Sequence, residues 1–307
     1  MIVTSSKTST LIAYLQMMRP ANILTAWADI LLGYAASGAV IVSTVNSLST
    51  ASLIPLGWLL LSTTGLYGGG VVFNDVFDAE LDAKERPERP IPSGRSSKQE
   101  AIVLGSALLI VGIVAAANVS TLSAALATFI AVAALSYDAI AKHNPFIGPL
   151  NMGLCRGSNL LLGVSAVPIM VQSHWFLALI PVVYIAAITT ISRGEVHGGS
   201  RSIGLLAVLM LSLVIGGLFG LALLPTYSGL NMLPFGLMFT ILILPEFIRA
   251  ALTPTAEQIR GAVKAGIICL IVLDAAIAAG FTNEIYGLGV LGLLPISKGL
   301  AKLFAVT

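Results

Sequence analysis

Long apolar runs separated by short polar connections make up most of this chain. A membrane-spanning helix needs about 20 consecutive, mostly apolar residues. Nine runs come close to that length, which predicts an all-helical, polytopic membrane bundle of about nine transmembrane helices. The runs lie at residues 21–43, 52–73, 100–117, 120–137, 146–168, 174–192, 203–224, 232–251 and 262–281.

Two shorter apolar segments flank this series. Residues 11–18 are too short to span a membrane, so we expect them to lie at its surface and to lead into the first span. Residues 285–304 are consistent with either a re-entrant segment or a tenth span. Because no soluble region or low-complexity linker interrupts the pattern, residues 1–307 are expected to form a single transmembrane domain.

The composition excludes an ordinary soluble protein. Of the 307 residues, 57% are hydrophobic and only 10% are charged, whereas soluble domains contain about 25% charged residues. Cys155 and Cys269 both lie within apolar runs. They are expected to be buried as small hydrophobic residues, because this placement suits neither a disulfide framework nor a cysteine metal site.

The positions of Lys and Arg predict the orientation, because basic residues are retained on the cytoplasmic side of a membrane. With a cytoplasmic N-terminus, the polar segments at 84–98, 138–145, 193–202 and 252–264 all lie inside, and the opposite connections contain no Lys or Arg. Lys298 and Lys302 are exceptions if there are nine spans. The formal net charge of +2 follows from this distribution and requires no nucleic-acid partner.

Charge is concentrated in FNDVFDAELDAKERPERPIPSG, residues 73–94, at the cytoplasmic end of the second run. On a helix, Asp75, Asp78 and Asp82 share one face, with Asn74 beside them. Like charges stacked in this way repel, so a cation is expected to offset them. Carboxylate oxygens favour Mg²⁺, whereas the alternative is a solvated acidic loop neutralised by neighbouring basic residues.

Three prolines and three arginines follow the acids. The prolines at 87, 90 and 92 prevent further helix and hold the chain extended. Arg86, Arg89 and Arg95 can then point toward whatever binds over the carboxylates, which is typical of a diphosphate site. The alternative is that these arginines only determine the membrane orientation.

Two other cytoplasmic segments carry candidate site residues. In YDAIAKHNPFIG, Tyr137 and Asp138 are followed one turn later by Lys142, which is either a phosphate ligand or a lysine that snorkels at a helix end. In ISRGEVHGGSR, Glu195 lies in a glycine-rich turn between Arg193 and Arg201. Taken alone, this turn is weak evidence for a metal site.

Together these segments resemble the UbiA superfamily of intramembrane prenyltransferases. The stretch from Asn74 to Asp82 matches the family motif NDxxDxxxD, and RPIPSG at 89–94 matches its continuation. The stretch from Tyr137 to Lys142 is similar to the family element YxxxxK, although Asp138 stands where serine is common. Arg19-Pro20 is similar to the start of the family's first helix.

The resemblance implies a nine-helix bundle with a polar cap that binds a prenyl diphosphate through Mg²⁺ and transfers the prenyl group to an aromatic or other lipophilic acceptor. Asp75, Asp78 and Lys142 then have the catalytic roles. The implied Mg²⁺ site comprises Asn74, Asp75, Asp78, Asp82 and Glu195. The implied diphosphate site comprises Arg89, Tyr137, Lys142, Arg193 and Arg201. Arg19, Arg156 and Asn159 are the candidate contacts to the organic substrates.

One departure from the family pattern affects the expected chemistry. The second acidic motif, DxxxD, falls on Glu195 to Gly199, so its second acid is absent. Either Arg193 or Arg201 substitutes for metal charge, or the site binds its ligand without catalysis. The stretch ISRGEVHGG is most similar to the UbiA-like branch encoded in Ebo gene clusters.

Ionisable residues within the apolar runs are expected to be functional, because they are costly in a membrane. The candidates are Asp29, Arg156, Glu246 and Asp274. Arg156 and the nearby Asn159 are expected to extend a polar track toward the acceptor, whereas hydrogen bonds between helices also explain the three acids. An ion path through a transporter is a rival interpretation, although no internal repeat supports it. A lipid-binding protein with reduced catalysis is the other alternative.

Overall fold

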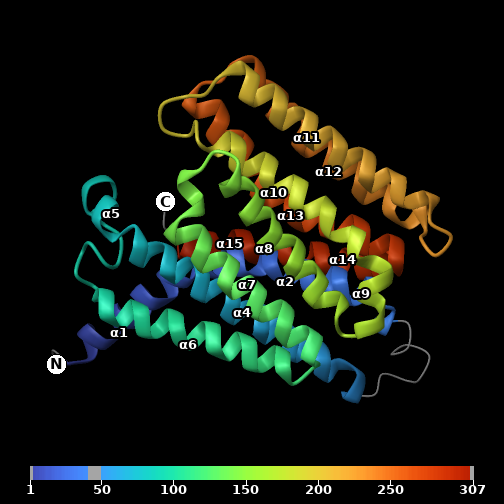
Figure 1. The fold of residues 1–307 in the computed structure, drawn as a ribbon. Coiled ribbons are helices and arrows are strands. Elements are labelled where there is room, and N and C mark those ends of the chain that lie inside the picture. Colours follow the sequence, from blue (N-terminus) through green and yellow to red (C-terminus); the bar gives the residue numbers. More distant parts are fainter. Residues whose placement is uncertain (1–2, 41–49, 305–307) are drawn as a thin grey trace.

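The computed structural model describes residues 3–40 and 50–304, and these residues form helices joined by short loops, with no strand among them (Figure 1). The helices are α1 (Val3–Met18), α2 (Pro20–Ala36), α4 (Thr50–Phe77), α5 (Ala79–Glu85), α6 (Lys98–Ala117), α7 (Thr121–Ala139), α8 (Ile147–Val164), α9 (Pro168–His174), α10 (Leu179–Ser192), α11 (Arg201–Gly220), α12 (Gly229–Leu252), α13 (Ala256–Phe281), α14 (Glu284–Leu291) and α15 (Leu293–Leu303). The predicted all-helical fold class is confirmed.

Each of the nine predicted runs contains helix within its described part, although residues 41–43 of the first run lie outside the described residues. Seven helical segments of the described chain are long and apolar enough to cross a membrane. α2 and α8 are not among them, because α2 has 17 residues and α8 includes the polar residues Asn151, Arg156 and Asn159. The number of nine spans therefore stays a prediction.

Local sequence signals explain several helix starts at the polar ends of the bundle. The Ser97 side chain accepts a hydrogen bond from the Glu100 backbone N–H, and the Glu100 carboxylate accepts one from the Ser97 backbone. This capping box satisfies backbone donors that lack helical partners. Ser200 and Thr255 cap α11 and α13 through similar side-chain bonds.

The C-terminal segment predicted at 285–304 forms α14 and α15, which run antiparallel to α2. The Tyr286 hydroxyl donates to the Leu31 carbonyl at 2.9 Å, and Ser297 Oγ donates to the Ala21 carbonyl at 2.8 Å. Since Ala21 lies in the first turn of α2, α15 leads back to the end of the bundle where α2 begins. Lys298 and Lys302 therefore lie toward that end, which removes the exception in the charge pattern.

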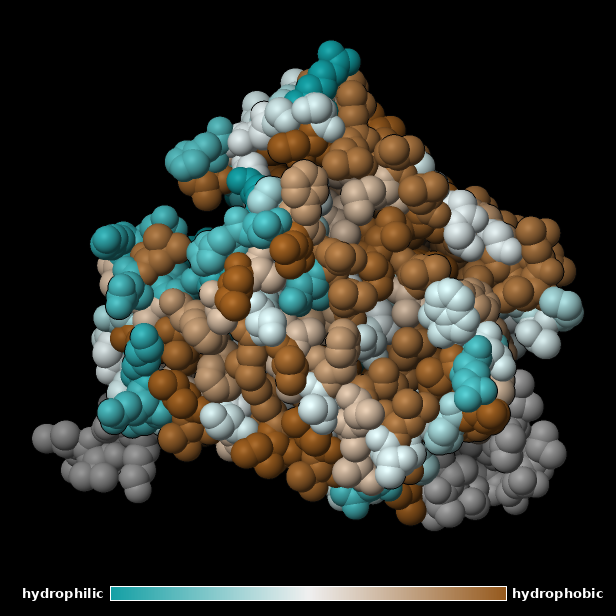
Figure 2. Space-filling view, in the orientation of Figure 1, coloured by the Kyte–Doolittle hydropathy of each residue, from teal (hydrophilic) through white to brown (hydrophobic). Residues whose placement is uncertain are grey.

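Most of the visible face of the molecule is hydrophobic, and hydrophilic residues gather mainly at the end that carries α5 and the neighbouring loops (Figure 2). Large apolar side chains such as Leu209, Leu213 and Ile241 are strongly exposed. Such a surface is suited to contact with lipid. The lipid interior offers no hydrogen-bond partners to backbone groups, so it favours helices, which satisfy these groups internally.

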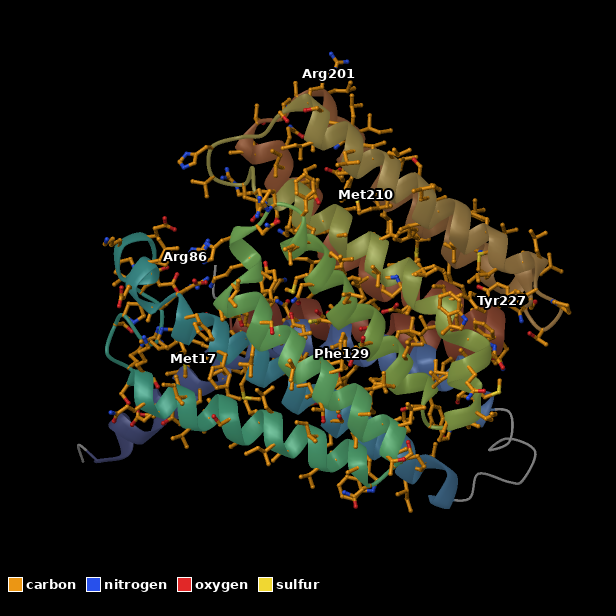
Figure 3. The ribbon with its side chains drawn as sticks, viewed as in Figure 1. Met17, Arg86, Phe129, Arg201, Met210 and Tyr227 are labelled. Atoms are coloured by element: carbon orange, nitrogen blue, oxygen red, sulfur yellow. The ribbon has the colours of Figure 1, made fainter. Side chains whose placement is uncertain are left out.

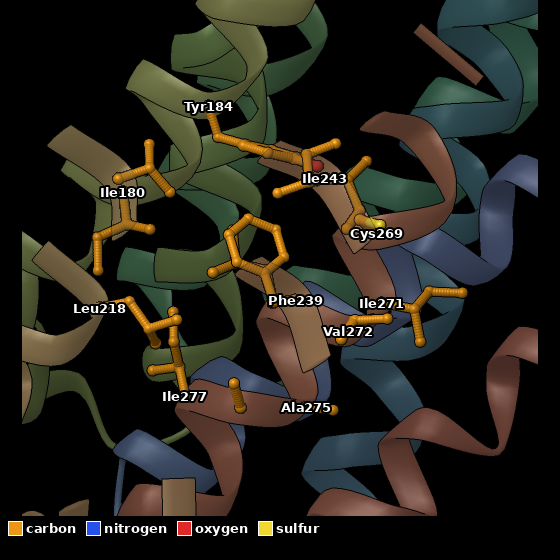
Figure 4. Close-up of a cluster of buried hydrophobic side chains, with 14 of the residues drawn as sticks. Ile180, Tyr184, Leu218, Phe239, Ile243, Cys269, Ile271, Val272, Ala275 and Ile277 are labelled. Carbon is orange, nitrogen blue, oxygen red and sulfur yellow. The ribbon is translucent and has the colours of Figure 1, made fainter. Parts of the chain in front are cut away.

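Buried apolar side chains around α13 hold the second half of the bundle together. Figure 4 shows Phe239 of α12 between Leu218 of α11 and Val272 of α13, and all three are almost completely buried. The Tyr184 hydroxyl donates to the Gly266 carbonyl at 2.8 Å, so the one polar atom of this buried ring is satisfied. This core fixes α10 and α13, which form part of the cavity wall described below.

α2 and α8 approach closely because glycines face each other across their contact. A Cβ atom added at Gly33 would lie 2.6 Å from the Val164 backbone nitrogen and closer still to the Leu160 carbonyl oxygen. Gly33→Ala is therefore expected to destabilise the protein by about 1–3 kcal/mol through overpacking. Unfolding in a graded series of denaturing detergent measures this loss.

The matched control is Gly57→Ala on α4, where an added Cβ would meet nothing within 4 Å. This variant is expected to be unchanged or slightly more stable, because alanine favours helix over glycine by about 1 kcal/mol. Equal stability of the two variants would contradict close packing at Gly33.

Candidate functional site

A cavity of about 420 Å³ lies between α2, α4, α7, α8, α10 and α13. Its polar mouth includes Arg19, Asn74, Tyr137, Asp138 and Glu195. Apolar side chains cover much of the remaining wall, among them Leu66, Ile130, Ile185, Ile188, Ile267 and Leu270. The site thus joins a charged opening to an apolar interior enclosed by membrane helices.

The acids at the end of α4 and in α5 are paired with basic side chains. Asp75 Oδ1 lies 2.8 Å from Arg19 Nη2 and 3.4 Å from Arg89 Nη1. Asp82 Oδ2 lies 2.7 Å from the same Arg89 nitrogen. Asp75, Asp82 and Arg89 are all buried, so these ion pairs are shielded from water.

The backbone around each pair explains how the arginines reach the acids. Arg19 is the one non-glycine residue with positive φ in the described chain, at 50°, and it directly precedes Pro20 at the start of α2. This left-handed conformation costs roughly 1–2 kcal/mol. The turn places the Arg19 side chain against Asp75 of α4, and the proline-rich loop after α5 does the same for Arg89.

Asp78 connects α4 to the loop after α7. Lys142 Nζ lies 2.5 Å from Asp78 Oδ1, and Asn74 Nδ2 donates to Asp78 Oδ2 at 3.2 Å. The same Asn74 nitrogen donates to Asp138 Oδ1 at 2.8 Å. Asp138 therefore joins the first motif, a role that the sequence analysis did not give it. Its position one residue after Tyr137 placed it near the site but did not indicate Asn74 as its partner.

The glycine-rich loop between α10 and α11 lies over this group. Arg193 Nη2 donates to the Lys142 carbonyl at 3.1 Å, and Arg260 Nη1 of α13 donates to the Glu195 carbonyl at 2.9 Å. Burial raises the pKa of Glu195 above its ordinary value, and the positive charges of Arg86 and Arg260 oppose this shift. A cation bound near Glu195 would lower the pKa again and favour the carboxylate.

Arg201 is the predicted site residue that lies apart from the others. It is the exposed first residue of α11 and does not line the cavity. Figure 3 shows its side chain at the outer edge of the molecule, pointing away from the bundle. Arg260 lies beside the loop instead, because α13 begins next to Glu195. The sequence pattern did not predict this residue.

Further inside the cavity, Arg156 and Asn159 of α8 line the wall as expected. Arg156 Nε lies 2.6 Å from Asp29 Oδ2, and Asn159 Nδ2 donates to the same oxygen at 2.8 Å. Asp274 of α13 adjoins Asp29. Glu246 is separate, because it pairs with Arg249 at 2.8 Å outside the cavity, so the four ionisable residues do not form one continuous path.

The oxygen donors at the mouth and beside it are of the kind that Mg²⁺ prefers. They are the carboxylates of Asp75, Asp78 and Asp138 and the amide oxygen of Asn74. Within the described residues, no group of three or more acidic, histidine or cysteine side chains is already gathered around a common point. The donor chemistry therefore fits Mg²⁺, provided that the basic partners of the acids turn toward an anion.

The fold and this cavity define a polytopic helical membrane protein with a charged site at one end of the bundle. Residues 30–263 match the UbiA prenyltransferase family, and the chain belongs to this family. Neither the match nor the fold separates the branches of the family, so the similarity to the Ebo branch stays a prediction.

Known relatives agree with this assignment. Digeranylgeranylglyceryl phosphate synthase from Methanothrix thermoacetophila is 36% identical over 180 residues, which cover 58% of this chain and 61% of the relative. The match thus spans less than two thirds of that relative's length. A solved structure of digeranylgeranylglyceryl phosphate synthase in membranes is similar in fold, with a TM-score of 0.68, 21% identity, and coverage of 89% of this chain and 98% of that chain.

A UbiA homolog from Archaeoglobus fulgidus has been solved with DMAPP and Mg²⁺ bound. It has a TM-score of 0.50 and 17% identity, and the comparison covers 91% of this chain and 99% of that chain. At this identity the likeness shows the shared fold.

Arg89 is expected to be essential for the stability of the site, because it pairs with two buried acids. Arg89→Met leaves Asp82 without its cation and Asp75 with Arg19 alone. The expected loss of stability is about 3 kcal/mol, the size seen when one partner of a buried pair is removed. Thermal unfolding of the purified protein measures it.

Lys84→Met serves as the control, because Lys84 is exposed at the end of α5. Its stability is expected to stay close to that of the wild type, since single surface charges contribute little. If Arg89→Met behaves like Lys84→Met, Arg89 does not stabilise the acids.

Proposed function

We propose that this protein is a Mg²⁺-dependent prenyltransferase that transfers a prenyl group from a prenyl diphosphate to a lipophilic acceptor within the membrane. The observation that carries the proposal is the cavity, which joins a mouth of acids and bases to an apolar interior. A prenyl diphosphate has the same division into a charged head and a hydrocarbon tail. Membership of the UbiA prenyltransferase family supports the proposal.

Asn74, Asp75 and Asp78 are the proposed contacts to Mg²⁺, with Asp82 and Glu195 completing the acidic surroundings. These residues would hold the ion, which would supply positive charge beside the diphosphate. The UbiA homolog from Archaeoglobus fulgidus with bound DMAPP and Mg²⁺ supports this choice of metal. Asp138, hydrogen-bonded to Asn74, keeps the amide in position.

Basic residues are proposed to exchange partners when the donor binds. In the structure Lys142 contacts Asp78 and Arg19 contacts Asp75. The positive charges of both side chains are therefore balanced by these acids. With the acids holding the ion, Lys142 and Arg19 would turn toward the diphosphate. Arg89, Arg193 and Tyr137 complete the proposed diphosphate site, whereas Arg201 is left out because it is exposed and its side chain points away from the bundle.

The chemistry follows from this placement. The carbon–oxygen bond of the allylic diphosphate breaks, and diphosphate leaves with the electron pair. Lys142 and the arginines stabilise the charge that develops on the leaving group. The apolar wall around Ile185, Ile188 and Leu270 keeps water from the allylic cation until the acceptor attacks and loses a proton.

The acceptor class and the orientation are also proposed. The relative from Methanothrix thermoacetophila is named for digeranylgeranylglyceryl phosphate, so geranylgeranylglyceryl phosphate is the first acceptor to test, together with aromatic acceptors. The mouth is proposed to face the cytoplasm, with the N-terminus on the same side. The concentration of Lys and Arg at this end supports that orientation.

Binding without turnover is a second candidate function. The observation that favours it is the altered second motif, in which Gly199 stands where the family has an acid. The mouth would then hold an isoprenoid diphosphate as a lipid-binding protein does. Measuring binding and turnover on the same preparation distinguishes the two candidates.

Asp78→Asn is expected to weaken Mg²⁺-dependent binding of geranyl diphosphate by about 10- to 100-fold, because a charged contact contributes roughly 1.5–3 kcal/mol. Calorimetric titration of the purified protein, with Mg²⁺ and with a chelator, measures the effect. Labelled geranylgeranyl diphosphate then reports turnover with the acceptors named above.

Glu246→Gln is the matched control, because this carboxylate pairs with Arg249 outside the cavity. Its binding is expected to equal that of the wild type. Metal-independent binding, or an Asp78→Asn variant that binds normally, would contradict the proposed site. Normal binding with no turnover of any donor would favour the second candidate.

A further inference from the structure

Deep in the cavity, one part of the wall is polar, whereas the wall around it is apolar. Thr63 Oγ1 donates to Asn159 Oδ1 at 2.7 Å, and Arg156 Nη1 donates to Thr25 Oγ1 at 3.2 Å. All four residues line the cavity. The rise of a helix puts Thr63 roughly 16 Å along α4 from Asn74 at the mouth.

Two acids lie behind this wall and do not line the cavity. Asp29 of α2 is completely buried and Asp274 of α13 is 2% exposed. Asp29 faces Arg156 and Asn159 of α8 and Asp274 of α13, and the two carboxyl groups lie within hydrogen-bonding reach of each other. The hydroxyl of Tyr184 on α10 is also near, but it is bonded to the Gly266 carbonyl.

The hydrogen-bond inventory of this cluster indicates one bound proton. Asp29 Oδ1 and Asp274 Oδ2 are buried and have no hydrogen-bond donor among the described residues. Two carboxylates and one guanidinium would leave a net negative charge in the membrane interior, which is costly. One proton between the acids removes that charge and provides the missing donor. Because Arg156 contacts Asp29, the proton belongs on Asp274.

We propose that the protonated Asp274, Asp29 and Arg156 form a neutral unit that holds Arg156 and Asn159 against the cavity as a subsite for an uncharged hydroxyl or carbonyl group. This inference rests on the proposed function, because the bound group belongs to the acceptor. The charge of Arg156 is balanced by Asp29, so the subsite is not built for a second anion.

The free hydrogen-bonding capacity at the wall agrees with a hydroxyl ligand. The Asn159 amide nitrogen is used by Ala26 and Asp29, but Asn159 Oδ1 and Thr63 Oγ1 each keep an acceptor position. The Arg156 guanidinium keeps donor hydrogens beyond its hydrogen bonds to Thr25 and its ion pair with Asp29. The subsite therefore fits one uncharged hydroxyl or carbonyl group of the acceptor at this inner wall.

Infrared spectroscopy of the full chain tests the proton. Asp274→Asn replaces the protonated acid by an amide of the same shape, so the carboxylic-acid C=O band of wild-type protein at neutral pH is expected to decrease in the variant. Labelling aspartate with carbon-13 assigns the band. A wild-type spectrum identical to that of Asp274→Asn would overturn the proton assignment. Asp29→Asn provides a second comparison should the first variant not fold.

Probe binding tests the subsite without requiring turnover. The uncharged probe 1-O-octylglycerol is compared with its di-O-methyl ether, using the protein in lipid nanodiscs and subtracting nanodiscs without protein. The wild type is expected to bind the hydroxyl probe about tenfold more tightly, which is the effect of one or two neutral hydrogen bonds. Thr63→Val and Asn159→Leu are expected to abolish this preference.

Thr128→Val is the matched control, because the Thr128 hydroxyl donates to the Ala124 carbonyl of its own helix and Thr128 is exposed. It is expected to retain the preference. Absence of a preference in the wild type, or its retention in both wall variants, would overturn the subsite. Geranyl diphosphate binding with Mg²⁺, measured on the same samples, reports the proposed function separately.

Discussion

The pairing of buried acids with basic side chains from other segments is the interaction on which the mouth of the cavity depends. Arg19 arrives from the turn before α2, Arg89 from the loop after α5, and Lys142 from the loop after α7. Acids placed so near hydrocarbon cannot remain without partners. The ion pairs therefore determine where three loops lie, and the same charges are available to a metal and an anion.

The cavity connects this charged mouth to a different environment inside. Its wall is mainly apolar around Leu66 and Leu270, and it becomes polar again at Asn159 and Arg156. The packing of α2 against α8 through Gly33 brings Asp29 close enough to contact Arg156. The polar wall therefore depends on the close contact between the backbones of α2 and α8.

Much of the fold and part of the site followed from sequence pattern. Hydrophobic runs predicted the helices, and the spacing of Asp75, Asp78 and Asp82 predicted acids at one helix end, because both depend on local periodicity. Contacts made by distant residues were harder to predict. Nothing local indicated that Asp138 would bond to Asn74, or that α15 would return to the start of α2. Arg201, chosen because it lies near Glu195 in sequence, points away because it begins a new helix.

An experimental structure of the full chain with Mg²⁺ and a non-hydrolysable thio analogue of geranyl diphosphate is the most direct test of the account. Lys142 Nζ is expected to leave Asp78 for a phosphate oxygen while Asp75 and Asp78 turn to the metal. A structure in which the analogue binds elsewhere, with the Lys142–Asp78 and Arg19–Asp75 pairs intact, would contradict it.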